Sequence, residues 1–179
     1  MGKLSDISDI NLCREIKAGN KEALKELYFR YYDPLYQFIW QRLYSTEHAK
    51  DFMQEIFTRI WQNKENIDKI TSIKAYLFRM ANNMIIDYIR KKSVRNTYML
   101  EQIQSINQTQ DDSTSEIQEA LLVAINKLPD KLQVAIKLNR YQGLTYAEIA
   151  EVCNVSIKTI EKRISKALQI LRNELKKEN

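Results

Sequence analysis

The residues best suited to chemistry are the cations and hydroxyls of the segment 156–166. At about 100° per residue, Lys158, Lys162 and Lys166 share one face of a helix. Lysines four residues apart repel one another, so they do not stabilise that helix by themselves. Such a row suits phosphates and base edges, and an ordinary solvated helix face is the alternative. The candidate contacts to duplex nucleic acid are Ser156, Lys158, Thr159, Lys162, Arg163 and Lys166.

A tight turn between two amphipathic helices should position these side chains. Thr145 and Glu148 have the spacing of a capping box, so a helix should begin at Tyr146. Asn154 suits a left-handed turn residue, and Ser156 suits the N-cap of the second helix. The residues predicted to face inward are Ala147, Ile149, Ala150 and Val152, and then Ile157, Ile160, Ile164, Leu168, Leu171 and Leu175. This arrangement is typical of a helix-turn-helix that enters a major groove.

Polar and aromatic side chains also mix along a second helical segment, residues 73–92. Amides can form paired hydrogen bonds with base edges, rings and guanidinium groups offer stacking planes, and cations follow phosphates, which together suit a melted strand. The candidates are Lys74, Arg79, Asn82, Asn83 and Arg90, beside the aromatic residues Tyr76, Phe78 and Tyr88. A buried stripe at Leu77, Ala81 and Ile85 leaves open that several aromatics belong to the core. Asp87 and Arg90 could form a structural ion pair.

The elements that carry both sets are expected to be helical. Three glycines and two prolines in 179 residues leave long unbroken segments, and no strand pattern is found. Helices should end at Gly19 and Gly143 and begin after Asn20, Ser72 and Pro129, and Pro34 should begin or kink one. In the N-terminal half the inward stripes comprise Ile10, Leu12, Cys13 and Ile16, and then Phe52, Ile56 and Ile60 with Met53 and Phe57 beside them.

Charge and composition divide the chain in two. The net charge is +5 over residues 1–95, −5 over 96–126 and +5 over 127–179. The stretch 107–115 is polar and has no aromatic or basic residue, as is typical of a linker. We therefore predict an all-α fold with helical domains at 5–95 and 116–177, joined by a flexible acidic linker at 96–115. Two basic blocks suggest that each domain faces a polyanion.

Other classes of function find little support in the sequence. His48 has no catalytic partner, and Asp111 and Asp112 fall in the predicted linker, so we expect neither an enzyme nor a small-molecule substrate. Cys13 and Cys153 predict buried free thiols in a reducing cytosol, without a metal site or a cofactor. No long apolar run or secretion signal is found, which favours a cytoplasmic protein. A stand-alone helix-turn-helix regulator is the alternative, although residues 1–95 lack the strands of a receiver domain.

Three segments resemble the extracytoplasmic function (ECF, group IV) sigma factors of bacterial RNA polymerase. The run "LPDKLQVAIKLNRYQGLTYAEIAEVCNVSIKTIEKRISKAL" is similar to region 4 of the family, "DFMQEIFTRIWQN" to region 2.2 and "IKAYLFRMANNMIIDYIRKK" to region 2.4. The three in this order are specific, and "SIKTIEKRISKAL" resembles members from Bacteroidota. The chain departs from the family pattern at Asn82 and Gln133, where Arg is frequent, and at Asn154, where Gly is frequent.

The resemblance implies an alternative sigma factor that binds core RNA polymerase and directs promoter recognition and transcription initiation. It assigns the −10 element to region 2.4, and the −35 element and the β flap to region 4. The loop from about Lys64 to Thr71 would hold a flipped −10 base, and an anti-sigma factor is an implied partner. The clamp helices of the β′ subunit would meet the outward face of region 2.2, at Asp51, Gln54, Glu55, Phe57 and Trp61.

Overall fold

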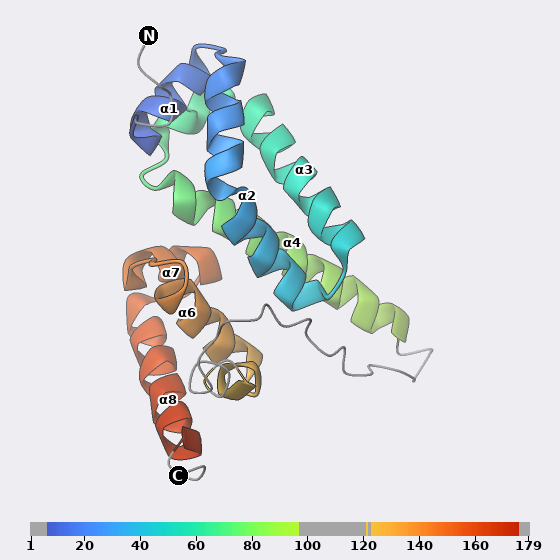
Figure 1. Cartoon of the computed structure of the whole chain (residues 1–179), viewed down its shortest axis with the longest axis vertical. Helices are drawn as coiled ribbons and strands as arrows, with labels where there is room; N and C mark the ends of the chain where they lie inside the picture. Colours follow the sequence, from blue (N-terminus) through green and yellow to red (C-terminus); the bar gives the residue numbers. More distant parts are fainter. Residues whose placement is uncertain (1–6, 97–120, 122, 176–179) are drawn as a thin grey trace, which may run out of the picture. The chain divides into compact units, whose positions relative to one another are not determined.

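The chain forms two compact helical units, Met1–Ile103 and Gln104–Asn179, which are described separately. A computed structural model describes residues 7–96, 121 and 123–175 (Figure 1). Every regular element in these residues is a helix, which confirms the predicted all-α class. The predicted linker at 96–115 lies outside the described residues apart from Asn96. Within the described part, no helix is both long and apolar enough to cross a bilayer.

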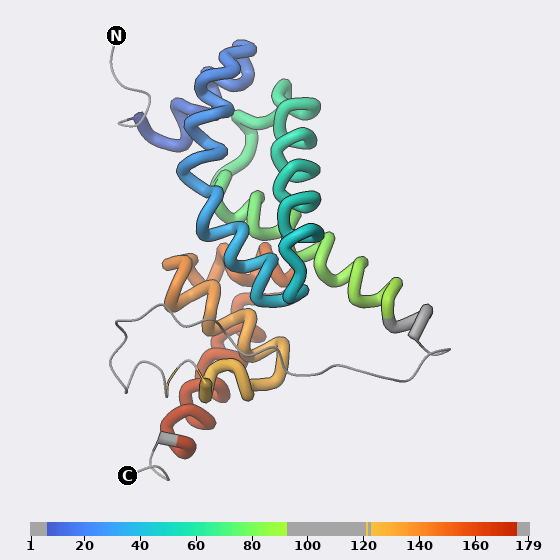
Figure 2. The backbone as a smooth tube through the Cα atoms, turned by 45° about the vertical axis from the view of Figure 1, so that its right-hand side comes forward, coloured from blue at the N-terminus to red at the C-terminus, as the bar shows by residue number. Residues whose placement is uncertain are grey.

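The N-terminal unit contains four α-helices and one 3₁₀-helix. These are α1 (Asp9–Lys17), α2 (Lys21–Leu43), α3 (Thr46–Gln62), η2 (Lys64–Lys69) and α4 (Ile73–Asn96). Helix α2 packs against α1, α3 and α4, and α1 packs against η2 (Figure 2). The fully buried side chains that join these elements are Leu12, Ile16, Leu27, Leu35, Ile39, Met53, Ile56, Ile67, Leu77, Phe78 and Ile85.

Short-range caps begin most of these helices, as the sequence predicts. The Asn20 side chain accepts hydrogen bonds from the backbone N–H groups of Glu22 and Ala23, and Ser72 Oγ accepts one from Ala75 at 3.2 Å. Gly19 adopts a φ of +88° directly after α1, where a left-handed residue closes a helix. The structure confirms these local features. They could be predicted because each depends only on residues a few positions apart.

Pro34 lies inside α2 rather than at the start of a new helix. Proline has no N–H, so the helix loses the hydrogen bond to the carbonyl of Arg30, and the ring favours a bend. The ribbon of α2 changes direction about midway along its length (Figure 1). Of the two roles predicted for Pro34, a helix start or a kink, the structure shows the kink.

The C-terminal unit consists of helical residues 123–126 followed by α6 (Asp130–Arg140), α7 (Tyr146–Cys153) and α8 (Ile157–Leu175). Helix α8 packs against α6 and α7. The core of this unit comprises Ile125, Leu128, Leu132, Ala135, Leu138, Leu144, Ile149, Val152, Ile160, Ile164, Ala167 and Leu171.

The turn between α7 and α8 has the predicted chemistry. Thr145 and Glu148 form both hydrogen bonds of a capping box at the start of α7. Asn154 ends this helix in the left-handed conformation, with φ +51° and ψ +53°. A side chain with a β-carbon is strained there, and Asn tolerates the conformation better than other residues that have one. The helix-turn-helix is therefore confirmed as a local structure.

Several apolar residues are more exposed than their spacing predicts. Ile10 is 60% exposed, Ile157 and Leu168 are each 49% exposed, and Ala147 is exposed as well. The buried side of α8 is centred on Ile160, Ile164, Ala167 and Leu171. Ile157 and Leu168 lie at its edge because they are rotated away from that centre by more than the neighbouring helices cover.

Gln133 of α6 fastens the end of the preceding helix. Its amide Nε2 donates to the carbonyl oxygens of Ile125 at 3.2 Å and Asn126 at 3.1 Å. The last carbonyls of a helix lack partners within the helix, and here a side chain supplies them. An amide donor is sufficient at this position, which explains why Gln can stand where Arg is frequent.

Replacing Gln133 by Ala should lower the free energy of unfolding of the C-terminal unit by about 1–3 kcal/mol, because two partly buried carbonyls lose their donor. Chemical denaturation of the full chain, followed by circular dichroism, measures this change. Gln169→Ala on the exposed side of α8 is the matched control and should shift stability by less than about 0.5 kcal/mol. Equal unfolding curves for the two variants would contradict the expectation.

Candidate functional site

The outer face of α8 carries three exposed cations in a row. Lys158, Lys162 and Lys166 are exposed, and they lie opposite the buried residues Ile160 and Ile164. Within the described residues, none of the three lysines forms an ion pair. Thr159 and Arg163 flank this face and are half-buried. The structure thus brings together the five cationic or hydroxyl side chains predicted along this helix.

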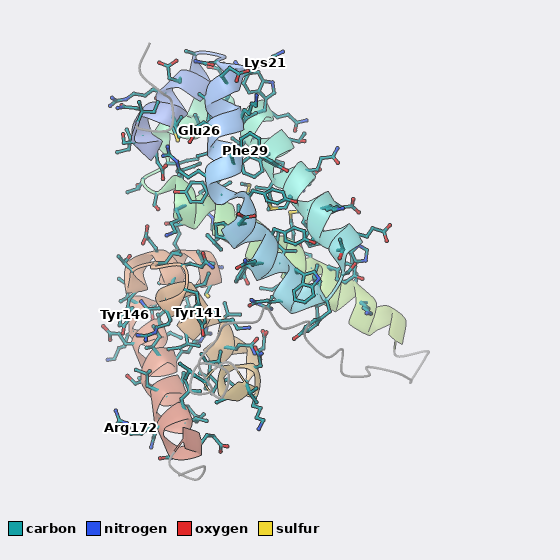
Figure 3. All side chains as sticks on the ribbon, in the orientation of Figure 1. Lys21, Glu26, Phe29, Tyr141, Tyr146 and Arg172 are labelled. Atoms are coloured by element: carbon teal, nitrogen blue, oxygen red, sulfur yellow. The ribbon has the colours of Figure 1, made fainter. Side chains whose placement is uncertain are left out.

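Ser156 has a structural role at the start of α8. Its Oγ accepts a hydrogen bond from the Thr159 backbone N–H at 3.2 Å and lies 2.8 Å from Thr159 Oγ1. The first N–H groups of a helix have no partner within the helix and favour a phosphate. Ser156 therefore orients the basic end of α8. Tyr146 lies exposed at the first turn of α7 (Figure 3).

On α4, three of the five predicted residues share one face. Helical geometry places Arg79, Asn83 and Arg90 within about 40° of one another. Arg79 is half-buried with its guanidinium 5.1 Å from the centre of the Tyr76 ring, and Asn83 and Arg90 are exposed. Arg90 also pairs with Asp87 at 3.1 Å, as its spacing allows. Lys74 is half-buried in the first turn, on a different side of the helix.

Asn82 does not belong to this surface. It is 4% exposed, and it is the buried polar side chain of the described residues. The core of the N-terminal unit surrounds the side of α4 on which it lies, beside buried Ala81 and Phe78. The prediction of a direct base contact by Asn82 is therefore wrong for this conformation, and the exposed amide is that of Asn83.

Helix α3 presents the polar residues predicted for its outer face. Asp51, Gln54 and Glu55 are exposed, and Glu55 pairs with Arg59 at 2.6 Å. Exposed aromatic area was expected at Phe57 or Trp61, and Phe57 is only 6% exposed because its ring packs 4.9 Å from that of Tyr28. The half-buried Trp61 supplies the accessible aromatic surface instead, with Lys64 Nζ 5.6 Å from its ring centre.

An open groove of about 650 Å³ runs between α2 and α3. Leu24, Tyr28 and Tyr32 line its α2 side, and Lys50, Met53, Gln54, Phe57, Thr58 and Trp61 line its α3 side. The rings of Tyr32 and Tyr36 continue the aromatic surface along α2, stacked at 5.7 Å. Sequence reasoning missed the α2 side, although Leu24, Tyr28 and Tyr32 recur every four residues and so share one stripe. Three of the predicted contacts line the groove, namely Gln54, Phe57 and Trp61.

The two thiols differ in exposure. Cys13 is buried and Cys153 is partly exposed, and neither forms a disulfide bond in the part of the chain that the structure describes. Burial, together with the nearby carboxylates of Asp9 and Asp68, raises the pKa of Cys13 to about 11. Within the described residues, no group of three His, Cys, Asp or Glu side chains could hold a metal ion.

Both units match known domain families. Residues 27–95 match sigma-70 region 2, and residues 118–171 match sigma-70 region 4. The chain is 28% identical over 176 residues to the ECF RNA polymerase sigma factor SigW of Bacillus subtilis, and the alignment covers 91% of this chain and 94% of SigW. It is 29% identical over 153 residues to SigM of the same organism, and this alignment covers 84% of this chain and 93% of SigM.

The chain belongs to the ECF sigma factors. It is accordingly an alternative sigma factor that binds core RNA polymerase and promoter DNA in transcription initiation. The match to region 2 excludes the stand-alone helix-turn-helix regulator, which would have another domain in its place. The sigma factors that it matches are not enzymes.

Solved structures show the same fold for this ECF sigma factor. The complex of CnrH with the cytosolic domain of CnrY aligns with a TM-score of 0.65 and 21% identity, covering 96% of this chain and 99% of that one. The complex of RpoE with the anti-sigma factor NepR from Bartonella quintana aligns with a TM-score of 0.70 and 24% identity, covering 85% and 96%.

Proposed function

We propose that this sigma factor divides its work among three surfaces. The α2–α3 groove, with Asp51, Gln54, Glu55, Phe57 and Trp61, binds the clamp helices of the β′ subunit. Helix α4 and η2 read the −10 element, and α8 reads the −35 element beside the β flap. The observation that carries the proposal is the row of lysines on α8, exposed and without ion pairs among the described residues, next to a firmly capped turn.

For the −10 element, the proposal uses the residues that share one face of α4. Asn83 offers an exposed amide for base edges, Arg79 with Tyr76 offers a stacking plane, and Arg90 offers a cation for phosphate. Lys74 contacts phosphate from the first turn of α4. Asn82 supports the packing of the helix and makes no contact with DNA.

For the −35 element, Lys158, Lys162 and Lys166 contact phosphates, and Arg163 and Thr159 approach base edges. Arg can bind guanine in bidentate fashion, and it lies on the flank of the lysine face. Ser156 holds the start of α8 so that its N–H groups meet a phosphate.

We extend the proposal to partners and setting. An anti-sigma factor covers one or both units, by analogy with the complexes of CnrH and RpoE named above. The domain bounds are 5–95 and 116–177 with a linker at 96–115, the protein acts in the cytoplasm, and it has no catalytic activity of its own. The Ile-, Lys- and Asn-rich sequence supports an origin in Bacteroidota.

Run-off transcription with purified core polymerase and a library of promoters tests these assignments. We expect transcripts that depend on both elements, and Asn83→Ala should relax one −10 position by about 1–3 kcal/mol, because only a base contact carries sequence preference. Lys21→Ala on the exposed start of α2 is the control and should keep the wild-type preference. Transcription that ignores the −10 sequence with the wild-type protein would refute the assignment of α4.

A further inference from the structure

Helix α1 is tied to the rest of its unit at both ends by ion pairs. At its start, Asp9 Oδ1 lies 2.6 Å from Arg30 Nη1, and its second carboxylate oxygen accepts a hydrogen bond from the Tyr31 hydroxyl. At its end, Lys17 Nζ lies 2.8 Å from Asp68 Oδ2, a contact that spans 51 residues of sequence. The first pair fastens α1 to α2, and the second fastens it to η2.

Buried apolar side chains fill the space between the two ion pairs. Leu12, Cys13 and Ile16 of α1 are at most 4% exposed, and Ile67 of η2 is 1% exposed. Among the described elements, α1 is the main packing partner of η2. Cys13 lies near enough to both Asp9 and Asp68 for their charges to raise its pKa, so it lies between the two ion pairs.

The 3₁₀-helix η2 depends on this packing for its shape. It is six residues long, and no side chain caps its first turn. A 3₁₀-helix has poorer hydrogen-bond geometry than an α-helix, so it rarely persists without tertiary support. Ile67 is buried, while Asn66 and Lys69 are exposed and hydrogen-bonded to each other at 2.9 Å.

We propose that Lys17 and Asp68 are positioning residues for −10 recognition, because α1 sets the place of η2 and so of the exposed Asn66 and Lys69. The inference rests on the proposed −10 role of η2. Lys17 holds the charged state of Asp68, since its ammonium group lowers the pKa of that carboxyl. The pair is therefore formed at neutral pH and is lost as the pH falls through the lowered pKa of Asp68.

The first test compares Lys17→Ala with Arg14→Ala in reconstituted holoenzyme. Both changes remove one cation from the last turns of α1, but within the described residues the Arg14 side chain donates only to Asn11 on its own helix. Permanganate footprinting of promoter melting should show opening slowed by about 2- to 5-fold for Lys17→Ala, the range expected for one partly exposed ion pair. The discrimination among −10 variants should fall in parallel. Arg14→Ala should match the wild type, and affinity for core polymerase should be unchanged in both.

A charge exchange separates positioning from a general loss of stability. Lys17→Asp places two carboxylates in contact and should slow opening further, whereas Lys17→Asp with Asp68→Lys keeps the combined side-chain length and restores attraction. Opening by the double variant should return to within about 2-fold of the wild type, since contacting residues are coupled. A double variant as slow as Lys17→Asp alone, with wild-type unfolding, would overturn the inference.

The thiol of Cys13 reports directly whether α1 has moved. In a Cys153→Ser background, Cys13 is the remaining thiol of the chain, and Lys17→Ala should speed its modification by a thiol reagent relative to Arg14→Ala. Faster modification with unchanged promoter opening would overturn the inference. If Asn66→Ala alters −10 preference while Lys17→Ala does not, only the inference fails. If neither variant alters it, the proposed −10 role of η2 fails as well.

Discussion

Replacement of Lys158, Lys162 and Lys166 by Ala together should weaken binding of the holoenzyme to promoter duplex by about 100-fold near physiological salt. Each phosphate contact releases about 0.9 counterions from duplex DNA, so the loss of three should flatten the salt slope by about 2.7 units. The loss should be the same for every −35 sequence, because phosphates carry no sequence information. Filter binding across a series of salt concentrations measures both quantities.

Arg172→Ala is the matched control for this variant. Arg172 is an exposed cation on the same helix, and it lies six residues beyond Lys166, about 9 Å further along the helix axis than the lysine row. Arg172→Ala should change the salt slope by much less than the roughly 0.9 units that one phosphate contact contributes. Arg163→Ala should instead cost about 1–3 kcal/mol on the cognate site and relax one position. Salt-independent and equal affinities for all three variants would mean that α8 never enters the groove.

Removal of the Trp61 side chain should lower affinity for core polymerase by about 30-fold or more. A large aromatic residue at the centre of an interface often contributes about 2 kcal/mol or more when truncated to Ala, and Trp61 lies half-buried at the groove beside Gln54. Titration of labelled sigma factor with core enzyme measures the change. Gln54→Ala with Glu55→Ala should weaken assembly in the same direction, without loss of helicity.

The chain supplies its own control for this experiment, since it has two tryptophans. Trp40 is half-buried near the end of α2, where it packs 5.8 Å from Tyr44, and it does not line the groove. Trp40→Ala should keep the affinity for core polymerase within about 2-fold of wild type at comparable helicity, as is usual outside a hot spot. Equal losses for the two tryptophan variants would refute the groove as the docking site.

The features that sequence predicts well are those decided by a few neighbouring residues. The capping box of Thr145 and Glu148, the left-handed Asn154 and the caps at Asn20 and Ser72 are all present. Each is a contact between residues two to four positions apart, so the local sequence determines it. The direction of each amphipathic face is determined in the same way.

The width of each buried face depends on the neighbouring helices, which local sequence does not specify. Asn82 and Phe57 lie deeper than predicted, whereas Ile10, Ile157 and Leu168 lie at the surface. Periodicity gives a direction on a helix, but the neighbouring helices determine how far burial extends on either side. This is why Asn82 is absent from the exposed face of α4, and why Trp61 rather than Phe57 offers accessible aromatic surface.

The segment 64–71 illustrates a second limit. Its charged sequence predicts a loop, yet residues 64–69 form η2, which packs against α1, and Ile67 is buried. The partners that stabilise it, including Lys17, lie about fifty residues earlier in the chain. No local pattern carries this information, and the same holds for the α2 side of the groove.

The kink at Pro34 also bears on how α2 moves. A helix opens most readily where its series of hydrogen bonds is interrupted. Local opening of α2 around residues 30–34 should therefore be more frequent than opening of the unbroken α3 beside it. Tyr28 lies before the kink and Tyr36 after it, which places one aromatic strip across two segments with separate exchange behaviour. A partner that contacts both segments would restrict that motion, and its binding would be weakened by the conformational entropy that α2 loses. A partner confined to one segment would leave the other free to fluctuate.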